Sequence, residues 1–125
     1  MAAIKGANTR PEKVVRVLVH RMGFRFGLHR KDLPGSPDIV FPRLRKVIFV
    51  HGCFWHGHKS CKRAKLPKTN RKFWAEKIGA NKRRDIVARN KLRGLGWGAL
   101  TLWQCQITQC SPKLATLIAK FLTDR

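Results

Sequence analysis

The sequence predicts an α/β fold in which helices flank a small mixed β-sheet. Three observations support this prediction: short apolar runs of strand length, three segments with helix signals, and turn residues between them. The chain has 125 residues, of which 43% are hydrophobic. This length suits one domain over residues 1–125 and is too short for two.

Helix signals occur near both ends of the chain and in its second half. Thr9 can cap the first helix, and Glu12 lies in its first turn, where a carboxylate favours the positive end of the helix dipole. A long helix is expected from Arg71 to Leu92, with Asn70 as its cap. A terminal helix is expected to open after Ser111.

Strand signals lie between these helices. Residues 24–28 alternate apolar side chains with Arg and Gly, which is strand spacing. The apolar runs Ile39–Phe41 and Val47–Val50 are joined by a short polar turn, which predicts a hairpin. Ala99–Trp103 is expected to form a further buried strand. Residues 51–69 are dense in His, Cys and Lys and are expected to be irregular.

The charge of the chain is extreme. There are 28 Lys and Arg residues against six acidic residues, which gives a net charge of +22. So many positive charges repel one another unless a polyanion neutralises them. Double-stranded DNA suits this role, because binding a basic protein releases its condensed counterions and so favours the complex. An anionic membrane is the alternative, but no basic amphipathic stretch carries a continuous apolar face. Nucleic acid is therefore the expected partner, with no membrane contact.

Neither a secretion signal nor a membrane-spanning segment is expected, because no apolar run is long enough for either. We expect the protein in a reducing bacterial-type cytoplasm, associated with the nucleoid through DNA. In that compartment the four cysteines are better interpreted as thiols or metal ligands than as disulfides.

Residues 51–61 concentrate the residues that can bind metal. Cys53, His58 and Cys61 follow a C-x4-H-x2-C spacing, and Cys105 or Cys110 can return as a fourth ligand. Thiolate and imidazole together suit tetrahedral zinc, and a closed set of four ligands is structural. The alternative is that small cysteines merely pack, but this polar loop offers little apolar surface for that.

Two further histidines in this window have two interpretations. His51 and His56 are either zinc ligands or acid–base groups beside a second metal. Asp38, at the start of the strand Ile39–Phe41 and thirteen residues before His51, supplies a carboxylate for the second option. Alone, the Asp in Ser-Pro-Asp is an ordinary turn residue.

Five motifs occur in order along the chain: Pro37-Asp38-Ile39-Val40-Phe41, Ile48-Phe49-Val50-His51-Gly52-Cys53-Phe54-Trp55-His56, Phe73-Trp74-x2-Lys77-Ile78-x2-Asn81-x2-Arg84-Asp85, Leu95-Gly96-Trp97 and Trp103-Gln104-Cys105. Together they resemble the very-short-patch repair (Vsr) DNA mismatch endonucleases. The resemblance covers the chain from Met1 to Cys105. It implies a restriction-endonuclease-like fold, a PD-(D/E)xK variant in which Phe49-Val50-His51 supplies Phe-x-His instead of the acidic-x-Lys pair.

The resemblance also implies a catalytic site. Asp38 would bridge catalytic Mg²⁺, and the main-chain carbonyl of Val50 would be a further ligand. His51 and His56 would act as acid–base groups, with Asp85 orienting His56 and raising its basicity. Glu12 would support the ligands of the Mg²⁺ ion indirectly, through water.

The same resemblance implies a ligand set for zinc and a surface for DNA. The zinc ligands would be Cys53, His58, Cys61 and Cys105. Cys110 would then be a free or packing thiol. Aromatic wedges beside the mismatch would be Phe54, Trp55 and Trp74, which composition alone would assign to the core. Further contacts to DNA would come from Met1, Lys77 and Asn81.

The function that follows is a Mg²⁺-dependent endonuclease that nicks duplex DNA at T:G mismatches in very-short-patch repair. The alternatives are a related nuclease with a changed DNA target and a zinc-stapled DNA-binding protein without catalysis. The expected partners are double-stranded DNA with a T:G mismatch and mismatch-repair proteins. We expect the chain itself to be a monomer.

Overall fold

The computed structural model describes residues 9–59, 61–109 and 112–124. The elements in chain order are α1 (Arg10–Arg21), β1 (Gly27–Leu28), β2 (Ile39–Phe41), β3 (Lys46–His51), the 3-10 helix η1 (Lys62–Ala64), α2 (Arg71–Gly94), β4 (Gly98–Trp103), α3 (Gln104–Gln109) and α4 (Pro112–Thr123). No helix among these residues is both long enough and apolar enough to cross a membrane.

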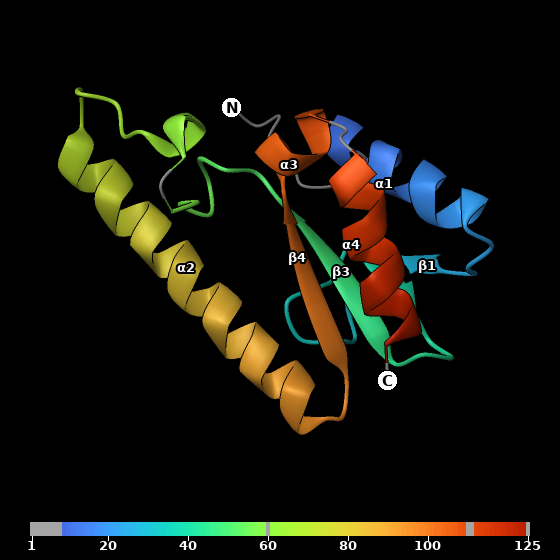
Figure 1. The fold of residues 1–125 in the computed structure, drawn as a ribbon. Coiled ribbons are helices and arrows are strands. Elements are labelled where there is room, and N and C mark those ends of the chain that lie inside the picture. The colour runs from blue at the N-terminus through green and yellow to red at the C-terminus, as the bar shows by residue number, and fades with distance from the viewer. Residues whose placement is uncertain (1–8, 60, 110–111, 125) are drawn as a thin grey trace.

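The four strands form one mixed sheet in the order β1-β2-β3-β4. β1, β2 and β3 pair antiparallel, whereas β4 pairs parallel to β3 after the long crossover through α2. In Figure 1, α2 lies on one side of the sheet, and α1, α3 and α4 lie on the other. The predicted α/β fold with a small mixed sheet flanked by helices is therefore confirmed.

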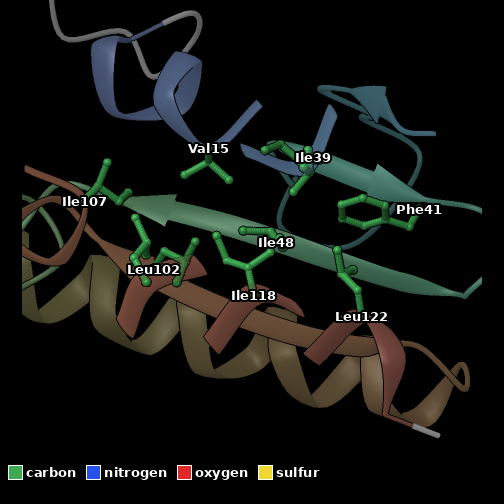
Figure 2. Close-up of a cluster of buried hydrophobic side chains, with 10 residues drawn as sticks. Val15, Ile39, Phe41, Ile48, Leu102, Ile107, Ile118 and Leu122 are labelled. Atoms are coloured by element: carbon green, nitrogen blue, oxygen red, sulfur yellow. The ribbon is translucent and has the colours of Figure 1, made fainter. Parts of the chain in front are cut away.

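Alternate residues of the strands bury two separate clusters, as the period of a strand requires. Ile39, Phe41 and Ile48 point into the larger cluster, which also takes side chains from α1, α3 and α4 (Figure 2). Val40 and Val47 point to the opposite face. There they pack with Leu33, Phe49 and Leu92, the last of these from α2.

The first helix begins as predicted. The Thr9 hydroxyl accepts a hydrogen bond from the Glu12 main-chain N–H, and the Glu12 carboxylate accepts one from the Thr9 N–H, which makes a complete capping box. The long helix also begins after the predicted residue, but Asn70 makes no side-chain cap and has a left-handed backbone with φ 56°. The predicted start of the terminal helix, at Ser111, lies outside the described residues.

Two further predictions need correction. The strand expected over residues 24–28 is reduced to Gly27–Leu28, the two residues that pair with β2, while Phe24 and Phe26 pack on the larger cluster. Their ring centroids lie 6.2 and 6.3 Å from that of Phe41. The short helix Gln104–Gln109 was not predicted, and it directly follows β4.

The sheet topology brings three chain segments to one end. Because β2 and β3 are antiparallel, Asp38 before β2 lies at the same end as His51, the last residue of β3. Because β4 is parallel to β3, its last residue, Trp103, lies beside His51 in register. The candidate functional residues gather at this end of the sheet.

Candidate active site and metal centre

Asp38 is held at the start of β2 by a backbone contact. Its Oδ2 accepts a hydrogen bond of 2.7 Å from the Val50 main-chain N–H on β3. Burial raises the pKa of the Asp38 carboxyl to about 7; the Val50 N–H opposes this effect, and the neighbouring charge of Glu12 adds to it. A half-buried carboxyl with so high a pKa favours a proton or a cation beside it.

Glu12 lies next to Asp38 and is almost completely buried, with 1% of its surface exposed. Its carboxylate accepts hydrogen bonds from Thr9, and His29 Nε2 lies 2.7 Å from Oε1. Ligand atoms of Glu12, His29 and Asp38 lie within 4.8 Å of one another. Three groups that can bind metal therefore meet where α1 crosses the sheet end.

His29 was missed in the sequence. It follows β1 directly, and its main-chain N–H donates to the carbonyl of Asp38 at 3.2 Å. Its backbone is left-handed, with φ 49°, which is uncommon for a residue other than glycine. The signal that could have found it is the pairing of β1 with β2, because that pairing carries the residue after β1 toward the residue before β2.

The second group consists of His51, His56 and Asp85. The two imidazole rings are stacked, with centroids 3.7 Å apart and planes 4° from parallel. His56 Nδ1 lies 2.7 Å from Asp85 Oδ2, whereas His51 Nδ1 lies 3.9 Å from the same oxygen. Asp85 is therefore within hydrogen-bond distance of His56 and contacts His51 only at the longer distance.

The two histidines differ in their surroundings. His51 is buried, with 6% of its surface exposed, and Nδ1 of its ring has no hydrogen-bond partner among the described residues. Burial, with the nearby His56 as the next cause, lowers the pKa of His51 to about 4. Its ring is therefore neutral at pH 7.

One cavity of about 430 Å³ reaches Asp38 of the first group and all three residues of the second. Asp38, His51, His56 and Asp85 line it, together with Gly35, Ser36, Phe49, Val50, Asn81, Arg84, Ala88 and Arg89. Arg84 and Arg89 come from α2, and they give the cavity two cations beside the carboxylates. A phosphate group is the ligand that such a mixture of guanidinium, imidazole and carboxylate suits.

The cysteines form a separate centre. Ligand atoms of Cys53, His58, Cys61 and Cys105 lie within 4.8 Å of one another. Cys105 Sγ lies 3.4 Å from His58 Nδ1, and the Cys105 N–H donates to Cys53 Sγ at 3.4 Å. The fourth residue of the cluster is thus Cys105, while Cys110 lies outside the described residues.

The donor set of this centre fits zinc. Three thiols and one imidazole nitrogen are the ligands of a Cys₃His site. Burial, with hydrogen bonds to the neighbouring thiols as a further cause, raises the pKa of Cys53 to about 12. A coordinated cation is what deprotonates thiols in such surroundings.

The loop between His51 and Cys61 is shaped by local contacts. The His58 N–H donates to the Cys53 carbonyl at 2.9 Å, which brings two cluster residues together. Gly57 has a φ of 59°, and a Cβ there would lie 2.8 Å from Ile78 and 3.0 Å from Lys82. Only glycine fits where this turn approaches α2.

The three predicted wedge aromatics form one cluster, outside both hydrophobic clusters. Ring centroids of Phe54, Trp55 and Trp74 lie 5.1 to 5.5 Å apart, with planes at 64° to 84°. All three are half-buried, and Asn81 Nδ2 donates to the Trp55 carbonyl at 2.9 Å. Lys77 is exposed on α2, and Met1 lies outside the described residues.

Comparison with known proteins decides the family. The family model described as DNA mismatch endonuclease Vsr matches residues 1–63. The chain is 43% identical over 107 residues to the DNA mismatch endonuclease Vsr of Escherichia coli strain K12, covering 86% of this chain and 68% of the relative. The chain belongs to the Vsr family. The predicted membership is confirmed.

Two further relatives support the activity and the fold. The type II nicking enzyme V.XorIIP of Xanthomonas oryzae pv. oryzae is 53% identical over 108 residues, which are 86% of this chain and 79% of the relative. The catalytic domain of the homing endonuclease I-Bth0305I superposes with a TM-score of 0.60 at 18% identity, covering 91% of this chain and 94% of that domain. The chain is therefore a DNA mismatch or nicking endonuclease with the predicted restriction-endonuclease-like fold.

Proposed function

We propose that this Vsr endonuclease nicks one strand of duplex DNA at a T:G mismatch in a Mg²⁺-dependent reaction. One observation carries the proposal: the Asp38 carboxylate and the Asp85–His56 pair line the same cavity of about 430 Å³. A hydrolytic nuclease needs a metal-binding carboxylate and an acid–base group on one phosphodiester. A protein that only binds DNA would not need a metal-binding carboxylate and an acid–base group in the same cavity.

The residues around Asp38 fit a hard cation. Mg²⁺ prefers oxygen ligands, and Asp38 with the main-chain carbonyl of Val50 would hold it, while Glu12 would support its waters. When bound, Mg²⁺ activates water and stabilises the charge that develops on phosphate oxygens. The buried Asp38 carboxyl, with its pKa of about 7, supports this assignment because a cation would stabilise its charged form.

The histidines would move the protons. His56 faces Asp85 through Nδ1, so Nε2 is the atom that can take or give a proton at the phosphodiester. The Asp85 carboxylate would hold the His56 ring in this orientation. His51, neutral at pH 7 and stacked on His56, would hold the ring in place and offer a second proton-transfer nitrogen.

The cysteine centre would hold structural zinc. Its four ligands, Cys53, His58, Cys61 and Cys105, leave no open position for substrate, as is usual for structural zinc. Zinc there would fasten the irregular loop after β3 to the start of α3. That loop carries His56, so the metal would stabilise the site without taking part in the chemistry.

The aromatic cluster would recognise the mismatch. Phe54, Trp55 and Trp74 would insert beside the mispair, where the base stack is weakest and unstacking costs least. Met1, Lys77 and Asn81 would contact the DNA next to them. We further propose that the protein acts as a monomer in the cytoplasm, bound to the nucleoid through DNA, with mismatch-repair proteins as its protein partners.

A second candidate is a nuclease of the same family with a changed DNA target. The names of several relatives favour it, because they are type II nicking enzymes and differ from one another in designation. The same Asp38–His56 chemistry would then act at another sequence or lesion.

A nicking assay tests the proposal. Two duplexes are compared that differ only in one pair, T:G against T:A, with Asp38→Asn protein as the inactive control. Strand-specific nicking of the T:G duplex that requires Mg²⁺ is expected. Equal nicking of both duplexes would overturn the mismatch assignment in favour of the changed target, and equal nicking by the Asp38→Asn protein would overturn the site.

A further inference from the structure

Trp103 lies between the two metal-binding centres. It is the last residue of β4 and stands in register with His51, the last residue of β3. Its indole is stacked on His58, with centroids 4.2 Å apart and planes 8° from parallel. The same indole meets His51 nearly at right angles, with centroids 5.4 Å apart and planes 78° apart.

The rings therefore form a continuous series. His58 contacts Trp103, Trp103 contacts His51, and His51 stacks on His56 at 3.7 Å. The first ring of the series belongs to the cysteine centre, and the last is hydrogen-bonded to Asp85. The backbone of Trp103 is also held, since its main-chain N–H donates to Gln106 Oε1 at 2.9 Å.

We propose that Trp103 is a positioning residue: it holds His51, and through it His56, in the orientation set by His58 of the zinc centre. The inference rests on the proposed zinc and histidine roles and adds the physical connection between them. Stacked and perpendicular aromatic contacts have preferred geometries, so a ring fixed on one side restricts its neighbour on the other. The orientation of a metal-bound histidine is commonly fixed by its outer neighbours, most often through a hydrogen bond.

The surroundings of Trp103 distinguish this role from ordinary core packing. Trp103 is half-buried and belongs to neither hydrophobic cluster. Instead it lines a second cavity of about 280 Å³ together with His51, His56, His58 and Asp85. Trp97, just before β4, shows the contrast because it packs on the cluster of Leu33, Val40, Val47, Phe49 and Leu92.

The experiment compares substitutions of these two tryptophans. Trp103→Leu removes the flat ring, Trp103→Phe retains one, and Trp97→Leu is the matched control for lost packing. Single-turnover nicking at saturating DNA and Mg²⁺, DNA affinity, and release of zinc to a chelator in the absence of DNA are measured below the unfolding temperature of each protein. The zinc measurement does not depend on activity.

Trp103→Leu is expected to lower the nicking rate by about 10- to 100-fold, the usual cost of a displaced catalytic or metal-orienting group, with little change in DNA affinity. Zinc release should accelerate. Trp103→Phe should stay close to the wild type. Trp97→Leu should lower thermal stability while leaving the rate and zinc release of the folded protein unchanged.

A second variant keeps the inference testable if Trp103→Leu does not fold. His58→Cys retains a four-ligand zinc centre but removes the ring on which Trp103 stacks. It should keep full zinc and lose rate as Trp103→Leu does, and the double substitution should lose no more than either one. A wild-type rate in zinc-loaded His58→Cys or in folded Trp103→Leu would overturn the inference alone. Wild-type protein without zinc would overturn the zinc assignment and the inference together.

Discussion

The two centres at the end of the sheet differ in how they are assembled. In the cysteine centre, Cys53, His58 and Cys61 come from one loop, and only Cys105 comes from a distant element. The groups around the candidate catalytic cavity come from the segment before β2, from β3, from the loop after β3 and from α2. The first centre is closed by soft donors, whereas the second is open and carries oxygen and imidazole donors. In the proposed roles, the first centre would retain its metal and the second would exchange metal and substrate.

Removing the Asp38 carboxylate should have the largest effect on activity. Asp38→Asn retains the shape and a carbonyl that can accept the Val50 N–H, but it removes the charge that would hold Mg²⁺. Nicking should fall below detection, while DNA affinity should be unchanged or higher, because one negative charge near the phosphate is gone. Asp32→Asn is the matched control, since Asp32 is exposed and pairs only with Arg30 among the described residues. Normal nicking by Asp38→Asn protein would refute the site.

Removing a ligand from the cysteine centre should lower the stability of the fold rather than act directly on catalysis. Cys105→Ala is expected to lower the unfolding free energy by a few kcal/mol, about 10 °C or more in Tm for a domain of this size, because structural zinc contributes folding energy directly. Elemental analysis should show less than one zinc per chain. Cys110→Ala is the control and should keep both zinc and Tm. The reverse pattern would assign the fourth position to Cys110.

His56→Ala should lower the nicking rate by about 10²- to 10⁴-fold, the usual range for a lost general acid or base. DNA affinity should hardly change. His20→Ala, at a surface position of α1, serves as control. If His56→Ala is as fast as the wild type and His51→Ala is not, then the proton is transferred by the buried ring and Asp85 acts through the stack.

The raised pKa of Asp38 makes its Mg²⁺ binding depend on pH. With a pKa of about 7, the carboxyl is mainly protonated at pH 6 and mainly ionised at pH 8, and a proton competes with the metal. The Mg²⁺ concentration for half-maximal nicking should therefore rise about tenfold from pH 8 to pH 6. His51, with its pKa lowered to about 4, stays neutral throughout this range and contributes nothing. A half-saturation that is constant from pH 8 to pH 6 would contradict Asp38 as the ligand.

The same contrast in assembly explains what could be predicted from the sequence. The C-x4-H-x2-C spacing is local, so it identified three members of the cysteine cluster before the fold was known. The apolar runs of β2, β3 and β4 were equally local, and their alternation placed the two faces of the sheet. Helices, strands and ligands that lie close together in the sequence can therefore be predicted without tertiary information.

Contacts between segments that are distant in the sequence could not be predicted in this way. His29 reaches Glu12 only because β1 pairs with β2, and β1 is too short to give a strong strand signal. From the sequence, Trp103 is expected to be an ordinary buried strand residue. Only the parallel pairing of β4 with β3 brings it beside His51. Arg89 enters the cavity only through the position of α2. The pairing of Asp38 with the histidines is the exception: the expected strands suggested it, the family resemblance gave it a role, and the topology explains it.

The smallest expected effect concerns recognition rather than chemistry. A chain of net charge +22 binds any duplex at low salt, so affinity alone cannot reveal wedging by the aromatic cluster. If Trp55 inserts into the stack, the preference for T:G over T:A should persist at high salt, where phosphate contacts are screened. Trp55→Ala should then reduce this preference by about 1–3 kcal/mol, the usual contribution of one aromatic–base stack, while general binding falls less.

Lysine provides the matched control for that measurement. Lys77→Ala removes an exposed cation on α2, and if Lys77 contacts phosphate, the change should weaken binding to both duplexes alike and flatten the salt dependence by about one unit. Among the described residues, the Trp55 ring meets the Phe54 and Trp74 rings edge-on and belongs to neither hydrophobic cluster, so its loss should lower Tm only slightly. A Trp55→Ala protein with a lowered Tm and an unchanged T:G to T:A ratio would show instead that the cluster is structural. Mismatch discrimination would then have to come from groups that line the catalytic cavity, such as Asn81 and Arg84.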